Sequence, residues 1–194
     1  MPVTRSKKRL WIEIALLGIL LVLVTVALRG AYRRYQQSSY PREYSQWVES
    51  YAAQYEFPPS LIYAIIRTES GFDPNAYSGA GARGLMQLTD STFTWAQNRE
   101  HAEEHASPEV LFDPETNIRY GVYVLSLLRE LYPVTDTMLA AYNGGLGNVA
   151  EWLKDPAYSS DGETLHTIPF PETSAYVQKV RDAQEIYQTL YDIA

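Results

Sequence analysis

Nineteen consecutive residues near the start of the chain, Leu10–Leu28, carry a single charge, Glu13. At about 1.5 Å of rise per residue, a helix of this length spans about 28 Å, close to the hydrocarbon thickness of a bilayer. Basic residues precede the stretch, and Trp11 stands where aromatic side chains meet lipid headgroups. The stretch therefore predicts a transmembrane helix, so that the rest of the chain folds outside the bilayer.

A cleaved signal peptide is the alternative interpretation of this stretch. Cleavage needs small residues spaced by one position just after the apolar run. The two triplets there, Ala27-Leu28-Arg29 and Arg29-Gly30-Ala31, lack that pattern, which favours an uncleaved anchor. Four basic residues precede the span and three follow it closely. This distribution gives a slight preference for an N-terminus inside the cytoplasm, with the folded domain on the outer side.

The charge of the chain is divided unevenly. Residues 1–34 hold seven basic and one acidic residue, a net charge of +6, whereas residues 35–194 hold nine basic and twenty-two acidic residues, a net charge of −13. The overall charge of −7 argues against nucleic acid as the main partner. The chain has no cysteine, which excludes disulfides, thiolate metal sites, a cysteine nucleophile and a cysteine-linked lipid anchor.

The sequence predicts four regions: a basic cytoplasmic flank (1–9), the transmembrane anchor (10–28), a polar stalk (29–42) and a folded domain (43–194). Apolar residues in the domain recur with helical rather than strand spacing, so the expected fold class is all-α, with six or seven helices. Asp90 and Asp113 are expected to cap helices. The expected helices cover 44–55, 61–68, 90–97, 114–131, 135–142, 148–153 and 171–191.

Two short motif matches are disfavoured by their surroundings. Residues 79–84 match G-x-G-x-x-G, but a dinucleotide site needs this run between a strand and a helix, and no strand precedes it. His101 and His105 match the H-x-x-E-H zinc pattern. The residues before them, 97–100, are all polar, and Pro108 follows closely, so a solvated acidic helix face is favoured over a metal site.

Glu69 is the outstanding ionisable residue. It follows the apolar segment 61–68, where loss of solvation raises the pKa of a carboxyl and prepares it as a general acid. Ser78 and Gln87 flank a glycine-rich run downstream, and both are neutral groups that can bind the hydroxyl and acetamido groups of a sugar. The alternative interpretation of Glu69 is an ordinary exposed glutamate at a helix C-terminus. Further downstream, Tyr142 and Asn143 precede Gly144 and Gly145, and there the alternative is a helix C-cap with Tyr142 in the core.

Four segments resemble the soluble lytic transglycosylase (SLT) family, and they occur in the family's order. The first contains Glu69, Ser78 and Gln87, the second Asn117 and Gly121, the third Tyr142 and Asn143, and the last Tyr176. The first segment reads ESGFDPNA and continues, after Ser78, with GARGLMQ. The second reads NI and has a glycine three residues later. The third reads AYNGG, and the last reads PETSAYV. The chain departs from the family at 88–91, where LTDS replaces the usual proline, and at 98–110, an acidic segment without a clear match.

The resemblance implies a lysozyme-like fold and an enzyme that cleaves the glycan strands of peptidoglycan. Together with the predicted transmembrane helix, it predicts a single-pass protein of the bacterial cell membrane with the catalytic domain on the wall side. Glu69 would be the only catalytic acid and base, with 1,6-anhydro ends as products. Ser78, Gln87, Tyr142, Asn143 and Tyr176 would line the glycan groove, without cofactor or metal. The sequence does not identify protein partners, whether in the cell wall or in secretion machinery.

Two other functions stay open. The first is a hydrolytic muramidase, for which Asp73 or Glu172 would activate water. The second is a tether that binds the wall without cleaving it, although a tether has no need of a buried acid.

Overall fold

The computed structural model describes residues 7–193, so residues 1–6 of the predicted basic flank, Arg5 among them, lie outside the described residues. One compact unit ends at Pro41 and the second begins at Arg42. Across residues 7–193 the regular structure is helical, and the only extended pairing is a set of isolated bridges at Tyr77, Arg83 and Leu88. The predicted all-α fold class is confirmed.

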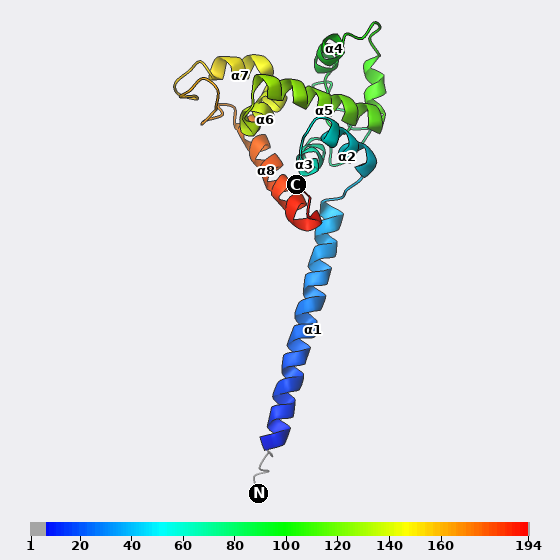
Figure 1. Ribbon diagram of the computed structural model, residues 1–194, viewed down its shortest axis with the longest axis vertical. Coiled ribbons are helices and arrows are strands. Elements are labelled where there is room, and N and C mark those ends of the chain that lie inside the picture. The colour runs from blue at the N-terminus through cyan, green and yellow to red at the C-terminus, as the bar shows by residue number, and fades with distance from the viewer. Residues whose placement is uncertain (1–6, 194) are drawn as a thin grey trace. The chain divides into compact units, whose positions relative to one another are not determined.

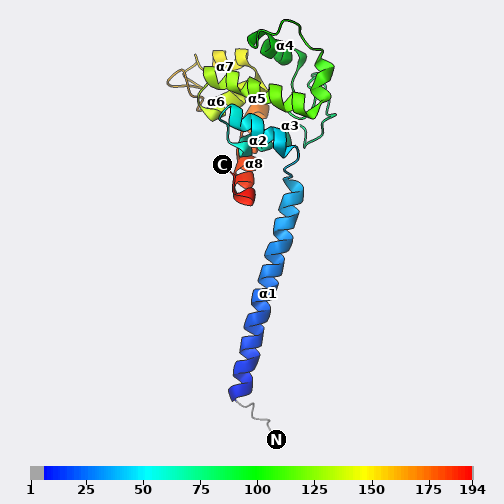
Figure 2. The same cartoon turned by 45° about the vertical axis from the view of Figure 1, so that its right-hand side comes forward.

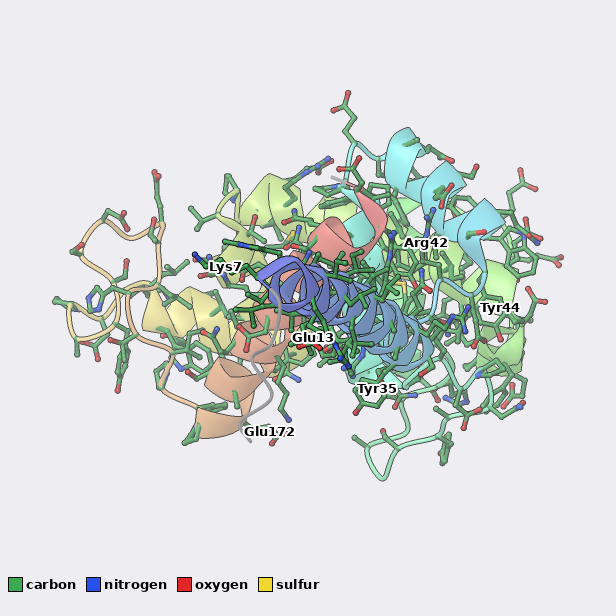
Figure 3. All side chains as sticks on the ribbon, turned by 90° about the horizontal axis from the view of Figure 1, so that it is seen from below. Lys7, Glu13, Tyr35, Arg42, Tyr44 and Glu172 are labelled. Atoms are coloured by element: carbon green, nitrogen blue, oxygen red, sulfur yellow. The ribbon has the colours of Figure 1, made fainter. Side chains whose placement is uncertain are left out.

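The first unit is a single helix, α1 (Lys7–Ser39), on which Lys7, Glu13 and Tyr35 are labelled in Figure 3. Its apolar side chains are exposed, and its most apolar 18-residue window has a mean hydropathy of 2.6. The helix is thus long and apolar enough to cross a membrane. Glu13 pairs with Arg9 at 3.3 Å, and such pairing lowers the cost of a charge near the bilayer.

The helix continues well beyond the apolar stretch, because α1 ends at Ser39 rather than at Leu28. Most of the segment 29–42, expected as a polar stalk, is therefore helical. Local bonds stabilise the end of this helix: the Ser38 hydroxyl donates to the Tyr35 carbonyl at 2.8 Å. Pro41 follows, and proline cannot supply the backbone N–H that a further helical turn needs.

The second unit consists of seven α-helices and one 3₁₀ helix within residues 42–193. They are α2 (Ser45–Gln54), α3 (Pro59–Glu69), α4 (Asp90–Arg99), η1 (Pro108–Phe112), α5 (Pro114–Leu131), α6 (Thr135–Gly144), α7 (Leu146–Trp152) and α8 (Pro171–Tyr191). Figures 1 and 2 show α4 toward the end at which α5 begins, and α6 and α7 toward the end at which α5 finishes.

The core forms around α3 and α5, whose sequences contain the longest apolar runs of the unit. Residues 60–66 of α3 are all buried, as predicted for a core helix. α3 packs against α8, where Tyr63 stacks on Tyr187 with ring centroids 5.3 Å apart. The predicted inner stripe of α5, from Ile118 to Leu128, is buried as well. This core fixes the C-terminal end of α3, and therefore Glu69.

The caps of two helices test the sequence predictions directly. Asp113 caps α5 as expected, since its carboxylate accepts from the Thr116 amide at 2.9 Å. For α4 the prediction was wrong: Thr89 is the cap, and its hydroxyl accepts from the Thr92 amide at 3.2 Å. Asp90 instead forms an ion pair with Arg83, which draws its carboxylate away from the helix end.

Two irregular segments contain the disfavoured motifs. Residues 79–84 lie in the long loop between α3 and α4, with no strand–turn–helix geometry around them. Residues 101–105, expected as a polar helix face, form bends and turns instead. The reason is the backbone at His101, which adopts a left-handed φ of 55° directly after α4 and stops the helix.

Candidate active site

A pocket of about 400 Å³ lies in the second unit. Five of the six site residues predicted from the sequence line it, namely Glu69, Ser78, Gln87, Tyr142 and Asn143. The sixth, Tyr176, does not line the pocket, but it interacts with the Glu69 carboxyl. The five predicted residues that line the pocket come from three separate segments: the end of α3, the loop 70–89 and the end of α6.

Glu69 is the last residue of α3, in which residues 60–66 are buried and Arg67 and Thr68 are partly exposed. Burial raises the pKa of its carboxyl from 4.5 to about 7, and the nearby Tyr176 hydroxyl offsets part of this increase. Loss of hydration disfavours the charged form of a carboxyl. Glu69 is therefore protonated in a large share of molecules at neutral pH, which is the state that a general acid needs.

Two tyrosines accompany Glu69. The Tyr142 hydroxyl donates to the Met86 carbonyl at 2.7 Å. The Tyr176 hydroxyl is buried and has no hydrogen-bond partner of standard geometry, although it is close enough to lower the pKa of Glu69. Burial, followed by the charge of Glu69, holds the pKa of both phenols well above 10, so both are neutral O–H groups.

The loop residues keep free hydrogen-bonding capacity. The Ser78 oxygen accepts from the Ala82 amide at 3.0 Å, which leaves its proton free to donate. The Gln87 side-chain NH₂ donates to the carbonyls of Ala76 and Gly84, at 3.2 and 3.0 Å. These bonds fix the Gln87 amide and leave its oxygen as an acceptor. Gln87 also has a left-handed φ of 50°, a strained conformation that the loop maintains.

Asn117, a fully buried residue to which the sequence analysis assigned no specific role, holds the loop against α5. Its oxygen accepts from the Met86 amide at 2.7 Å, and its NH₂ donates to the carbonyls of Arg83 and Leu111 at 2.9 and 2.8 Å. Because Met86 in turn accepts from Tyr142, Asn117 connects α5 to the pocket. Its place in the family resemblance was the one signal that pointed to it.

Sequence reasoning also missed part of the lining. Thr89, the N-cap of α4, and Thr92 and Trp95 within that helix line the pocket. Glu172, named from the sequence only as a possible base for hydrolysis, also lines it from the first turn of α8, where Figure 3 labels it. The two acids named for hydrolysis are thereby separated: Glu172 lines the pocket, whereas Asp73 does not. Among residues 7–193 no three His, Cys, Asp or Glu side chains are grouped to hold a metal ion.

The comparisons with known proteins agree with the geometry. Residues 46–164 match the family described as Transglycosylase SLT domain. The soluble lytic murein transglycosylase of Escherichia coli K12 is 33% identical over 159 residues, which cover 81% of this chain and 25% of that protein. The membrane-bound lytic murein transglycosylase C of Cronobacter sakazakii is 33% identical over 167 residues, covering 75% of this chain and 46% of that protein.

Solved structures show the same fold. An inactive Glu-to-Gln mutant of the lytic transglycosylase Slt from Pseudomonas aeruginosa matches with a TM-score of 0.70 at 34% identity, over 80% of this chain and 25% of that one. The 70-kDa soluble lytic transglycosylase of Escherichia coli matches with a TM-score of 0.70 at 30% identity, over 86% and 27%. The expected lysozyme-like fold is confirmed. The chain spans about a quarter of the length of these soluble relatives.

Proposed function

Because this chain belongs to the transglycosylase SLT family, we propose that it is a membrane-anchored lytic transglycosylase. Its substrate is the glycan of peptidoglycan, cleaved at the β-1,4 bond between N-acetylmuramic acid and N-acetylglucosamine. The observation that carries this proposal is a carboxyl with a pKa of about 7 on the wall of a pocket of about 400 Å³. The names of the similar proteins support the same activity.

Glu69 acts first as an acid. It gives its proton to the oxygen that joins the two sugars, so that this oxygen leaves as the 4-hydroxyl of N-acetylglucosamine. Positive charge develops at C1 of the muramic acid, and the acetamido group of that sugar stabilises it, as in substrate-assisted glycosidases. The solved Pseudomonas relative, which a Glu-to-Gln change leaves inactive, supports a glutamate in this role.

Glu69 then acts as a base. As a carboxylate it takes the proton of the muramic C6 hydroxyl, whose oxygen forms a bond to C1. The product is a 1,6-anhydro end, water is not consumed, and Glu69 regains its proton. A pKa of about 7 suits both steps, because neither the acid nor the carboxylate is strongly disfavoured at neutral pH.

Neutral hydrogen-bonding groups hold the sugar during these steps. The free proton of Ser78, the free oxygen of Gln87 and the amide of Asn143 provide donors and acceptors along the pocket. The buried Tyr176 hydroxyl, which lacks a standard partner, is available to the carboxyl or to the substrate. Neutral hydrogen-bonding groups of this kind are suited to an uncharged sugar, whereas the net negative charge of the domain does not contribute to its binding.

Helix α1 anchors the enzyme as a single span, with the N-terminus in the cytoplasm and residues 43–194 on the outer, wall-facing side. The support for this arrangement is the exposed apolar surface of α1 and the existence of membrane-bound relatives. Without a cysteine, the chain has no site for a thioether-linked lipid. The helix is therefore the anchor that we assign.

Hydrolysis to a reducing end is the second candidate function, because a second carboxylate, Glu172, lines the pocket. Glu172 is exposed, so a water molecule can reach it. A hydrolase would use Glu172 as the base that activates this water. The two reactions differ in their products, since a hydrolysed end contains one water more than an anhydro end.

The deciding experiment digests purified peptidoglycan with the full chain in detergent and identifies the new glycan ends by mass. We expect anhydro ends, and a loss of at least about a hundredfold in rate for Glu69→Gln, since general acid catalysis contributes this much or more. Glu130→Gln, an exposed glutamate outside the pocket, is the matched control. Reducing ends, together with loss of activity in Glu172→Gln, would identify a hydrolase, and binding without any product would identify a tether.

A further inference from the structure

One part of the pocket surface has no role in the chemistry proposed above. It belongs to α4, from which Thr92 and Trp95 line the pocket together with the capping residue Thr89. Thr92 and Trp95 are three positions apart, so they share one face of the helix. The opposite face, with Phe93, Ala96 and Gln97, is buried in the core. The helix therefore presents hydroxyl groups and an indole ring to the pocket.

This surface lies away from the end of the pocket that Asn143 forms. The pocket lining includes residues of the α6–α7 connection, Val124 and Leu128 of α5, and residues of α4. In Figures 1 and 2, α4 and the α6–α7 pair lie toward opposite ends of α5. A polymer bound along this wall would contact both sets of residues with different units of its chain.

Trp95 has the properties of a binding surface. Its ring is only partly buried. The Arg99 guanidinium lies over one face of the indole, 5.9 Å from the ring centroid. Within residues 7–193 no other aromatic ring packs on it, and its N–H makes no hydrogen bond. A flat apolar ring with a free N–H, beside two threonine hydroxyls, matches a sugar, which has an apolar face and a hydroxyl rim.

We propose that Trp95 forms a distal subsite, where it binds a saccharide unit of the glycan other than the two units at the cleaved bond. The subsite rests on the proposed function, since it assumes a glycan in the pocket. It makes Trp95 a determinant of substrate length: strands that reach α4 bind more tightly than fragments that reach only the Glu69 end. Because Trp95 does not touch the reacting atoms, it affects binding of the strand rather than the chemical step.

The test compares steady-state kinetics of the full chain in detergent on long, peptide-free glycan strands. For Trp95→Ala we expect KM to rise about tenfold, equivalent to about 1.4 kcal/mol, with kcat within about twofold of the unsubstituted protein. Trp95→Phe keeps a ring, so its KM should stay within about threefold. Trp47→Ala is the matched control, because Trp47 lies on α2 outside the pocket. An unchanged KM in Trp95→Ala, or an equal effect on kcat, overturns the subsite.

A second measurement keeps this result separate from the proposed function. The Glu69→Gln chain, which cannot turn over, is titrated with a hexamer of β-1,4-linked N-acetylglucosamine. The added Trp95→Ala change should raise the Kd about tenfold. No binding, or binding that Trp95→Ala leaves unchanged, overturns the subsite whether or not the enzyme cleaves peptidoglycan. Failure of the unsubstituted chain to cleave peptidoglycan overturns the proposed function alone.

Discussion

At the scale of single residues, burial determines the chemistry of Glu69. Its pKa of about 7 comes first from lost hydration, with the Tyr176 hydroxyl acting in the opposite direction. We expect kcat/KM for peptidoglycan cleavage to be level below about pH 7 and to fall about tenfold per pH unit above it, as the acid form disappears. Initial rates between pH 5 and 9 measure this profile. A fall that begins near pH 4.5 would mean that Glu69 titrates like an exposed carboxyl.

The same shift predicts a pH-dependent stability. The folded pKa is raised above the unfolded one, so the folded state binds the proton more tightly, and this contribution is lost as pH rises from about 4.5 to 7. Glu69→Gln removes the titration. Relative to Glu69→Gln, the unsubstituted chain should therefore lose about 3 kcal/mol of unfolding free energy between pH 4.5 and 8. Thermal unfolding of both chains at the two pH values tests this, and parallel curves would contradict it.

The sequence could predict those site residues whose signal is local. Glu69 follows an apolar helix, and Ser78, Gln87 and Asn143 lie in recognisable segments, so the sequence pointed to the residues that line the pocket. The structural role of Asn117, and Trp95 altogether, were missed for a physical reason. Asn117 acts on Met86 and Arg83, 31 and 34 residues away, and Trp95 joins the lining only once α4 has packed. Partners at such distances cannot be read from helical periodicity.

At the scale of elements, the loop between α3 and α4 depends on a close approach to α5. A Cβ on Gly84 would lie 2.2 Å from the Leu111 carbonyl oxygen and 2.3 Å from the Asn117 side-chain nitrogen, and Gly84 has a φ of +71°. Glycine is therefore required where the loop touches α5. The G-x-G-x-x-G letters at 79–84 reflect this packing rather than a phosphate site.

This contact predicts a large effect of one methyl group. Gly84→Ala should destabilise the fold by about 3 kcal/mol, which lowers the unfolding midpoint by about 6–12 °C. Gly79→Ala, in the same loop, has no atom within 4 Å of the added Cβ and should change stability by less than about 0.5 kcal/mol. Thermal scans of the two variants provide the comparison. Equal midpoints would show that the loop relaxes around the added methyl.

The positions of α5 and α8 were predictable because each has a long apolar stripe that is buried in the structure. The predicted helix at 114–131 agrees with α5, and the predicted start and end at 171 and 191 agree with α8. Local competition explains the differences: Asp90 pairs with Arg83, so Thr89 caps α4. The 3₁₀ helix Pro108–Phe112 was not predicted, since a single short turn leaves no periodic pattern.

At the scale of the whole molecule, the surface of α1 differs in polarity from the surface of the second unit. Its apolar residues are exposed, whereas those of the second unit are mostly buried. We expect Leu20→Arg combined with Leu21→Arg to release the protein from carbonate-washed membranes, because each central arginine costs about 3 kcal/mol of insertion energy. Gln36→Arg with Gln37→Arg, beyond the apolar stretch, is the control that should stay bound. A shortened chain in the soluble fraction would instead indicate cleavage after a signal peptide.

The packing of α3 against α8 has a consequence for when activity can arise during synthesis. Glu69 lies at the end of α3, and Tyr176 comes from α8 (Pro171–Tyr191), which is synthesised after the other segments that line the pocket. In a nascent chain that lacks α8, solvent has access to the Glu69 carboxyl, which then ionises as an ordinary glutamate does. We therefore expect the proposed acid to acquire its raised pKa only after α8 has been synthesised and has docked on α3.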